Sequence, residues 1–407
     1  MVPGALSVHC RSDLRRSRDW PCTPRISRCK CNVIQDPPLP TVGLSLRGLI
    51  LVRLRVSNEL GSAAAVLQGL GGWVPPRVVT NEELPASWGV DDAWVRRRTG
   101  IGTRHWADAD TSTGDAAERA ARLALASART PRVDAVIVAT STPDRPMPAT
   151  APQLASRLGL EGVAAWDVSA ACSGFVYGLA AAAGVICAGI AERVLLVAAD
   201  VYSTLIAPED RSAGVVFADG AGAVVLRRGL SGEPGGVLGF DLGSDGTGHH
   251  LIEVAGGGAL ERARPRAYRP ADRYFRMDGR EVFQHAVTRM TESSRLLLKN
   301  VGWTAAHVDR LVAHQANARI LSAVGERLDI PADRCVNHVE RVGNTGAASI
   351  PLALADAAAR EDLRAGQRVL ITAFGAGLTW GSAALLWPEL DRIAPVHDTG
   401  TSAGRSL

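Results

Sequence analysis

The chain has 407 residues, of which 46% are hydrophobic, and its 45 basic and 41 acidic side chains give a formal net charge of +4. This composition predicts a globular protein with a sizeable core, built as one large or two medium-sized domains. The charge is too balanced to indicate nucleic-acid binding by itself. The best candidate for a membrane span, residues 44–56, is interrupted by three arginines, so we expect no membrane-spanning segment.

Residues 1–62 form the first predicted region and differ in composition from the rest. They are rich in Arg, Pro, Cys and Ser, and they lack a sustained apolar pattern before Leu44, so we predict a disordered extension. Arg15, Arg16 and the scarcity of acids resemble a targeting segment, but the apolar core and cleavage site of a signal peptide do not follow. A start codon placed too far upstream is at least as good an explanation.

The seven cysteines fit no usual zinc pattern. Cys29 and Cys31 are too close together for a standard ligand pair, and no second pair follows, so we expect no metal site. The three cysteines at positions 172, 187 and 335 lie far apart in a body without secretory features. This usage is typical of a protein in the reducing cytoplasm.

A repeated strand pattern follows the extension. Apolar strands are predicted at 133–139 and 308–313, both beginning with Val-Asp, and their starts are 175 positions apart. A second pair of predicted strands, 194–200 and 369–375, has the same offset. The sequence therefore indicates a duplicated unit.

The duplication sets the predicted domain organisation. We expect an N-terminal half at 63–230, a C-terminal half at 231–389 and a loose tail at 390–407. Because apolar strands alternate with helical stretches, the fold class is α/β, with mixed sheets covered by helices.

The most informative segment, residues 167–179, places Cys172 between an apolar strand and a helix. At a helix N-terminus the macrodipole favours the thiolate, which is the nucleophilic form of cysteine. Cys187 and Cys335 have no such setting, and we expect them to be small buried side chains.

Two polar clusters lie downstream in apolar or small-residue surroundings. His314 lies in Val-Ala-His-Gln-Ala-Asn, and Asn344 lies in Val-Gly-Asn-Thr-Gly-Ala-Ala-Ser-Ile-Pro. Taken alone, such a histidine is more often structural and such an asparagine more often forms a turn. Together with Cys172 they indicate acyl-thioester chemistry.

These three motifs resemble those of the β-ketoacyl-acyl-carrier-protein synthase III family of the thiolase superfamily. The family patterns are close to A-C-x-G-F, H-Q-A-N-x-R-I and G-N-T-x-A-A-S-x-P, and the resemblance runs from about Ala63 to Trp387. It implies a duplicated, thiolase-like, five-layered αβαβα fold in which the helices after Cys172 and Gly346 pack together. It also implies a cytoplasmic homodimer that needs no metal or cofactor, since coenzyme A and acyl-carrier-protein thioesters are its substrates.

The resemblance further implies a decarboxylative condensation that initiates fatty-acid or polyketide chains. Cys172 would take the acyl group from an acyl-CoA, with an oxyanion hole made by the backbone N–H groups of Cys172 and Ala376. An alanine fits at position 376 only if its φ is negative. Malonyl-acyl-carrier protein would then lose CO2, and two neutral donors, His314 and Asn344, would stabilise the enolate.

The binding residues are also those that the resemblance implies. They are Trp94, Arg98, Arg211 and Asn317 for coenzyme A, Arg319 for docking of the acyl-carrier protein, and Met147, Phe217, Met277 and Phe283 for the acyl pocket. Met147 would cross the dimer interface to close the partner's pocket. Residues 261–273, rich in arginine, are expected to form a surface insertion.

This interpretation has four alternatives. A type III polyketide synthase of the chalcone-synthase kind also uses Cys, His and Asn, but its motifs differ. A degradative thiolase needs a second cysteine in a late turn, where this chain has Phe-Gly-Ala-Gly. An acyltransferase on the same scaffold that uses another acceptor, and a non-catalytic partner of a synthase dimer, stay open, although all three motif residues are present.

Overall fold

The structure is a computed structural model, and it describes residues 62–391, 393, 394 and 396. The predicted extension and most of the predicted tail therefore lie outside the described residues. The boundary expected at 230/231 falls directly after strand β7, which ends at Leu230. None of the described helices has the length and apolarity that crossing a membrane requires.

The first of two large sheets has five strands in the order β1-β7-β6-β4-β5. The pairs β4–β6 and β4–β5 are parallel, whereas β1–β7 and β6–β7 are antiparallel. The strands are β1 (Ala63–Trp73), β4 (Ala135–Ala139), β5 (Ala164–Val168), β6 (Arg193–Val201) and β7 (Asp219–Leu230).

The second sheet repeats this topology with the order β11-β12-β13-β8. Its strands are β8 (Val237–Ser244), β11 (Arg310–Ala313), β12 (Arg368–Gly375) and β13 (Thr379–Leu386). Strands β4 and β11 begin at 135 and 310, and β6 and β12 begin at 193 and 368, so both pairs keep the offset of 175. The counterpart of β5 is reduced to one parallel bridge between Leu311 and Cys335.

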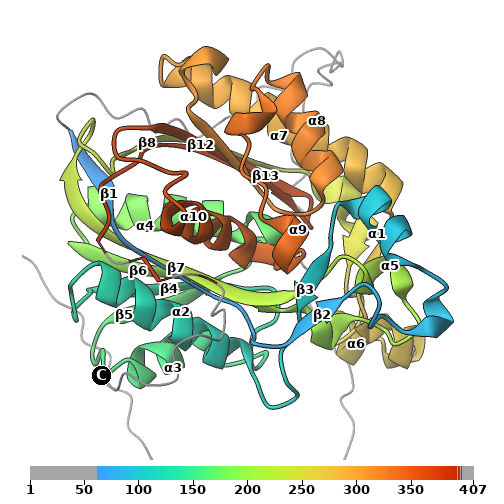
Figure 1. Cartoon of the computed structure of the whole chain (residues 1–407). Coiled ribbons are helices and arrows are strands. Elements are labelled where there is room, and N and C mark those ends of the chain that lie inside the picture. The colour runs from blue at the N-terminus through green and yellow to red at the C-terminus, as the bar shows by residue number, and fades with distance from the viewer. Residues whose placement is uncertain (1–61, 392, 395, 397–407) are drawn as a thin grey trace, which may run out of the picture. The chain divides into compact units, whose positions relative to one another are not determined.

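Helices form the other three layers (Figure 1). Helices α4 (Gly174–Cys187) and α10 (Ser349–Ala359) lie between the two sheets, and their small residues join both sheets in one core cluster. Helices α2 (Thr113–Ser127) and α3 (Thr150–Arg157) cover the outer face of the first sheet, while α7 (Gly279–Asn300) and α8 (Ala318–Arg327) cover that of the second. The predicted five-layered thiolase-like fold is thus confirmed.

Local sequence explains where the longer helices begin. Ser112 and Asp115 form a capping box at the start of α2, and the Asp278 side chain accepts hydrogen bonds from the N–H groups of Arg280 and Glu281 at the start of α7. Each arrangement satisfies backbone donors that the first helical turn leaves unpaired.

Shorter elements surround the side of the molecule on which the site lies. They are β2 (Val78–Thr80), α1 (Asp92–Thr99), β3 (Thr103–His105), α5 (Arg211–Gly214), β9 (Ile252–Glu253), α6 (Ala259–Ala263), β10 (Arg276–Met277) and α9 (Val339–Val342). The arginine-rich segment 261–273 consists of the end of α6 and two 3-10 turns, and its arginines are exposed at the surface.

Candidate active site

Cys172 lies in a 3-10 turn, Ala171–Ser173, that joins β5 to the N-terminus of α4. Ala171 has a φ of 45°, in the left-handed region that residues other than glycine rarely adopt. The Ser173 hydroxyl donates to the carbonyl of Thr379 over 3.0 Å and ties the turn to the second sheet. The thiol is therefore at the helix N-terminus that the sequence predicted.

The protonation state of Cys172 differs from the expectation. Burial raises the pKa of its thiol to about 12, and the nearby Asp200 carboxylate adds to this rise, while a hydrogen bond from Tyr202 opposes it. Desolvation of the charged form thus favours the thiol in the resting protein. This direction differs from the predicted preference for the thiolate, because strand, turn and helix patterns do not reveal how protein atoms enclose the sulfur of this half-buried residue.

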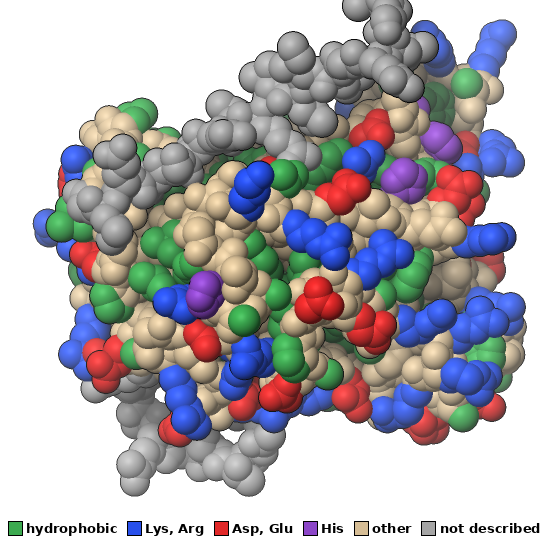
Figure 2. All heavy atoms as spheres, turned by 90° about the horizontal axis from the view of Figure 1, so that it is seen from above, with side chains coloured by type: hydrophobic (Ala, Val, Ile, Leu, Met, Phe, Trp, Pro, Cys, Tyr) green, Lys and Arg blue, Asp and Glu red, His purple; other side chains and the backbone are tan. Residues whose placement is uncertain are grey.

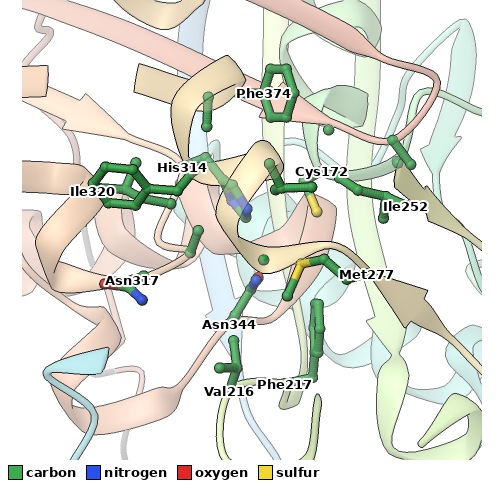
Figure 3. A pocket seen from close by; sticks show the side chains of 18 of the residues that line it. Cys172, Val216, Phe217, Ile252, Met277, His314, Asn317, Ile320, Asn344 and Phe374 are labelled. Atoms are coloured by element: carbon green, nitrogen blue, oxygen red, sulfur yellow. The ribbon is translucent and has the colours of Figure 1, made fainter. Parts of the chain in front are cut away.

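Cys172, His314 and Asn344 line one cavity of about 150 Å³, although they come from three distant segments. Figure 3 shows their side chains directed toward the same region of this pocket. The predicted wall residues Phe217, Met277 and Phe283 line it too, together with Tyr202, Ile252, Phe275, Val282, Met290 and Ile320. A mostly apolar cavity with a few convergent polar groups is typical of a small-molecule site.

His314 follows β11 and is buried. Its Nδ1 is 2.7 Å from the Ser349 hydroxyl oxygen, which also accepts the N–H of Gln315 over 3.3 Å. We assign the serine hydroxyl as the donor to Nδ1, which puts the imidazole proton on Nε2. Burial lowers the pKa of His314 to about 3, so the imidazole is neutral, as the predicted role of a neutral donor requires.

Asn344 is held by its backbone and by its own carboxamide oxygen. Its N–H donates to Val216, and its carbonyl accepts the N–H of Ala218, over 2.9 and 2.8 Å. The side-chain oxygen accepts the N–H of Gly346 over 3.0 Å. This bond orients the amide, so that the NH2 group is the part available as a donor to the pocket.

The turn after β12 lies directly against the Cys172 turn. A Cβ at Gly375 would be 2.8 Å from the backbone nitrogen of Cys172 and 2.9 Å from that of Ser173, so glycine is required by close approach. Ala376 lines the pocket. The described non-glycine residues with positive φ are Arg129, Ala171, Asp329 and Glu361, so the condition on an alanine at 376 is met.

Three residues predicted to bind coenzyme A come together at the surface. The guanidinium carbons of Arg98 and Arg211 lie 5.2 and 5.7 Å from the ring centroid of Trp94. The Trp94 ring is half-buried against a small apolar cluster, while both arginines are exposed. A planar ring flanked by cations suits an aromatic base that carries phosphates.

Asn317 and Arg319 connect this cluster to the pocket. Asn317 lines the pocket, accepts the N–H of Arg319 over 2.8 Å and donates to the carbonyl of Arg98 over 3.4 Å. Arg319 places its guanidinium 5.7 Å from the ring of Phe283, a wall residue. Arg319 therefore stands beside the pocket wall.

Met147 lies apart from the other predicted wall residues. Its side chain is 84% exposed and it does not line the pocket of its own chain. Sequence reasoning also missed Tyr202, Phe275 and Ser349. Ser349 belongs to the Asn344 motif and was therefore findable, whereas nothing in the sequence marks Tyr202 or Phe275 as pocket residues.

The described residues include no group of three or more His, Cys, Asp and Glu that could hold a metal ion. The fold and the pocket define a class of protein: duplicated sheets around two buried helices, with a cysteine at the start of one of them, are the architecture of thiolase-like enzymes.

Comparisons with known proteins narrow this class. Family models for 3-oxoacyl-[acyl-carrier-protein] synthase III and for its C-terminal part match residues 166–246 and 298–387. β-Ketoacyl-[acyl-carrier-protein] synthase III 5 of Streptomyces coelicolor is 56% identical over 332 residues, which cover 82% of this chain and 100% of the relative. The Pseudomonas aeruginosa PAO1 synthase III is 52% identical over 335 residues, which cover 82% of this chain and 99% of the relative.

Solved structures agree with the sequence matches. The crystal structure of 3-oxoacyl-(acyl carrier protein) synthase III from P. aeruginosa PAO1 has a TM-score of 0.76 at 50% identity, covering 81% of this chain and 100% of that one. The priming β-ketosynthase of the R1128 polyketide pathway has a TM-score of 0.73 at 33% identity, covering 83% and 99%. This chain belongs to the β-ketoacyl-acyl-carrier-protein synthase III family, which confirms the resemblance.

Proposed function

We propose that this protein catalyses the decarboxylative condensation of an acyl-CoA with malonyl-acyl-carrier protein, with Cys172, His314 and Asn344 as its catalytic residues. The observation that carries the proposal is the convergence of these three side chains in one apolar pocket of a synthase III fold. The product is a β-ketoacyl thioester.

In the first half-reaction Cys172 attacks the acyl-CoA carbonyl. The backbone N–H groups of Cys172 and Ala376 stabilise the oxyanion, and Gly375 permits the close approach of the two turns. The Cys172 proton leaves with coenzyme A, which departs as a thiol. The acyl group stays on the cysteine as a thioester.

In the second half-reaction the malonyl group loses CO2. The resulting enolate oxygen accepts hydrogen bonds from His314 Nε2–H and the Asn344 amide, and removing one such donor typically costs roughly 10² to 10³ in rate. The enolate carbon then attacks the acyl group, and Cys172 leaves as a thiolate, which takes up a proton from solvent to restore the thiol. Because burial keeps His314 neutral, it donates without giving up its proton.

The binding residues follow the same proposal. Trp94, Arg98 and Arg211 hold the adenine and phosphates of coenzyme A, and Asn317 lies along the path to the pocket. Arg319 docks the acyl-carrier protein. Toward the side of α1 and α5, the face in Figure 2 carries several basic side chains among acidic ones, and the basic groups could meet an acidic partner.

Further features complete the proposal. We propose a homodimer, in which Met147 closes the acyl pocket of the partner, and activity in the cytoplasm with neither metal nor redox cofactor. A relative that primes a polyketide pathway supports a role in chain initiation.

The test measures the two half-reactions separately. Intact-protein mass spectrometry after incubation with a panel of acyl-CoAs should show one acyl adduct on Cys172, and Cys172→Ala should abolish it. His314→Ala and Asn344→Ala should still become acylated but should fail to release CO2 from malonyl-acyl-carrier protein. Cys187→Ala is the matched control and should behave as the unmodified protein.

Three results would contradict the proposal. A stable adduct on Cys187 or Cys335 would remove Cys172 as nucleophile. Loss of acylation with intact CO2 release in the His314 and Asn344 variants would reverse their roles, and acyl transfer to another acceptor without CO2 release would identify an acyltransferase instead.

A further inference from the structure

Tyr202 is a pocket residue that the proposed mechanism does not use. It begins a 3-10 turn, Tyr202–Leu205, directly after β6, and it is only 3% exposed. Its ring lines the same pocket as Cys172. Its hydroxyl is hydrogen-bonded to the side chains of Cys172 and Ser141.

The Tyr202 ring is fixed from several sides. It stacks on Phe217 at 4.9 Å between centroids with an interplanar angle of 22°, and it meets the edge of Phe275 at 6.0 Å. A Cβ at Gly346, whose φ is 59°, would collide with the tyrosine ring and with the Asp200 carboxylate. Packing therefore holds the hydroxyl at the sulfur without help from a substrate.

The charged and titratable groups around the sulfur determine whether Tyr202 or Cys172 is the donor of this hydrogen bond. Asp200 lies at the end of β6, His314 follows β11 and is neutral, and Tyr202 follows β6. Burial, Cys172 and Asp200 together raise the pKa of Tyr202 well above its usual range, so the phenol keeps its proton. A protonated phenol can only donate to a thiolate.

We propose that the Tyr202 hydroxyl donates a hydrogen bond to Sγ of Cys172 and stabilises the thiolate that forms during acyl loading. Tyr202 is then a further catalytic residue, since it touches the reacting atom. The bond from the acyl carbon to the coenzyme A sulfur breaks, the bond to Sγ forms, and the Cys172 proton ends on coenzyme A. Tyr202 keeps its own proton throughout.

The loading step rests on the proposed function, but the reactivity of the thiol can be measured without it. Tyr202→Phe removes the hydroxyl and keeps the ring. Iodoacetamide alkylation of Cys172, followed by peptide mass spectrometry, should become about tenfold slower at a fixed pH near 8, because a lost hydrogen bond to a charged group raises the thiol pKa by about one unit. Acyl loading should slow by a similar factor.

Tyr177→Phe is the matched control. Tyr177 lies on α4, and its hydroxyl donates to the carbonyl of Gly243 over 2.8 Å, away from Cys172, so alkylation should be unchanged. N-Ethylmaleimide should show the same tenfold loss in Tyr202→Phe as iodoacetamide, since a change in pocket access would affect reagents of different size differently.

Each outcome decides the matter. A folded Tyr202→Phe variant alkylated at the original rate would overturn the inference, as would unequal losses with the two reagents. If alkylation slows but no acyl-CoA labels Cys172, the inference stands and the proposed function fails. Should the variant not fold, 3-fluorotyrosine at position 202, a stronger donor, must accelerate alkylation, and an unchanged rate would again overturn the inference.

Discussion

Asp200 and Gly375 occupy equivalent positions at the ends of β6 and β12, 175 residues apart, and each lies against the turn of the other half. The Asp200 carboxylate accepts the N–H of Ala347 over 2.8 Å. Gly375 lies against the N–H of Cys172, the counterpart of Ala347. In one half, the N–H of Ala347 is thus occupied by the Asp200 carboxylate. In the other half, the N–H of Cys172 faces a glycine, which leaves room for an oxyanion to bind.

Gly375→Ala should therefore disable acyl loading. The added Cβ would lie 2.8 Å from the Cys172 nitrogen, so one of the two turns must shift. We expect loading to fall by roughly 10² or more, the usual effect of losing one oxyanion donor. Rapid-quench mass spectrometry measures the rate. Gly184→Ala, on α4 with open space around it, is the control and should load normally; normal loading in Gly375→Ala would exclude the assigned oxyanion hole.

Ser349→Ala should affect the second half-reaction and not the first. Without the hydroxyl, Nδ1 of His314 and the N–H of Gln315 lose their partner, and the Nε2–H tautomer is no longer fixed. We expect CO2 release to fall by about tenfold, as for one lost hydrogen bond of about 1 to 1.5 kcal/mol, with acyl loading unchanged. An equal loss in both half-reactions would mean that Ser349 only supports the fold.

Acid should weaken the fold through His314. In the unfolded chain its imidazole binds a proton below about pH 6.5, whereas the folded state does not until about pH 3. The free energy of unfolding should therefore fall as the pH drops from about 6.5 toward 3. Burial raises the pKa of Asp200 to about 7, so protonation of this carboxyl stabilises the fold as the pH falls. A His314 variant is therefore needed to separate the two contributions. The free energy of unfolding is measured by urea unfolding between about pH 3 and 6.5, and in His314→Asn it should depend less steeply on pH than in the unmodified protein. The same pH dependence in both proteins would mean that folding does not change the pKa of His314.

The three catalytic candidates could be predicted because each lies in a short continuous motif, and such a motif can be recognised from the sequence alone. The duplicated sheets could be predicted too, because the apolar strand segments and their constant offset of 175 residues are visible in the sequence itself. Tyr202 escaped prediction because its position depends on packing between Phe217, Phe275 and Gly346, which lie in distant segments. The protonation of Cys172 was misjudged because desolvation is a property of the assembled core.

Trp94 and the two arginines beside it should contribute to the binding of acyl-CoA and not to the decarboxylation of the malonyl group. Trp94→Ala removes the surface between the guanidinium groups of Arg98 and Arg211. We expect KM for acyl-CoA to rise about tenfold, in line with a loss of 1 to 2 kcal/mol, with CO2 release from malonyl-acyl-carrier protein unchanged. Arg97→Ala, an exposed position on the same helix, is the control. A Trp94→Ala variant with the original KM would place the coenzyme elsewhere.

If Met147 enters the acyl pocket of a partner subunit, it limits the length of the acyl chain that this pocket accepts. Its side chain is 84% exposed in the single chain, which leaves it available to another surface. Met147→Phe should narrow selection toward acetyl-CoA and Met147→Ala should admit longer chains, since one methylene in an apolar pocket is worth roughly 1 to 3 kcal/mol, or about 10 to 200-fold. Competition between acetyl-CoA and a four-carbon acyl-CoA measures the ratio, and size-exclusion chromatography with light scattering reports the oligomeric state. A dimer whose ratio is unchanged in both variants would show that Met147 does not reach the pocket of the partner, and the wall would then consist of residues such as Phe217 and Met277 alone.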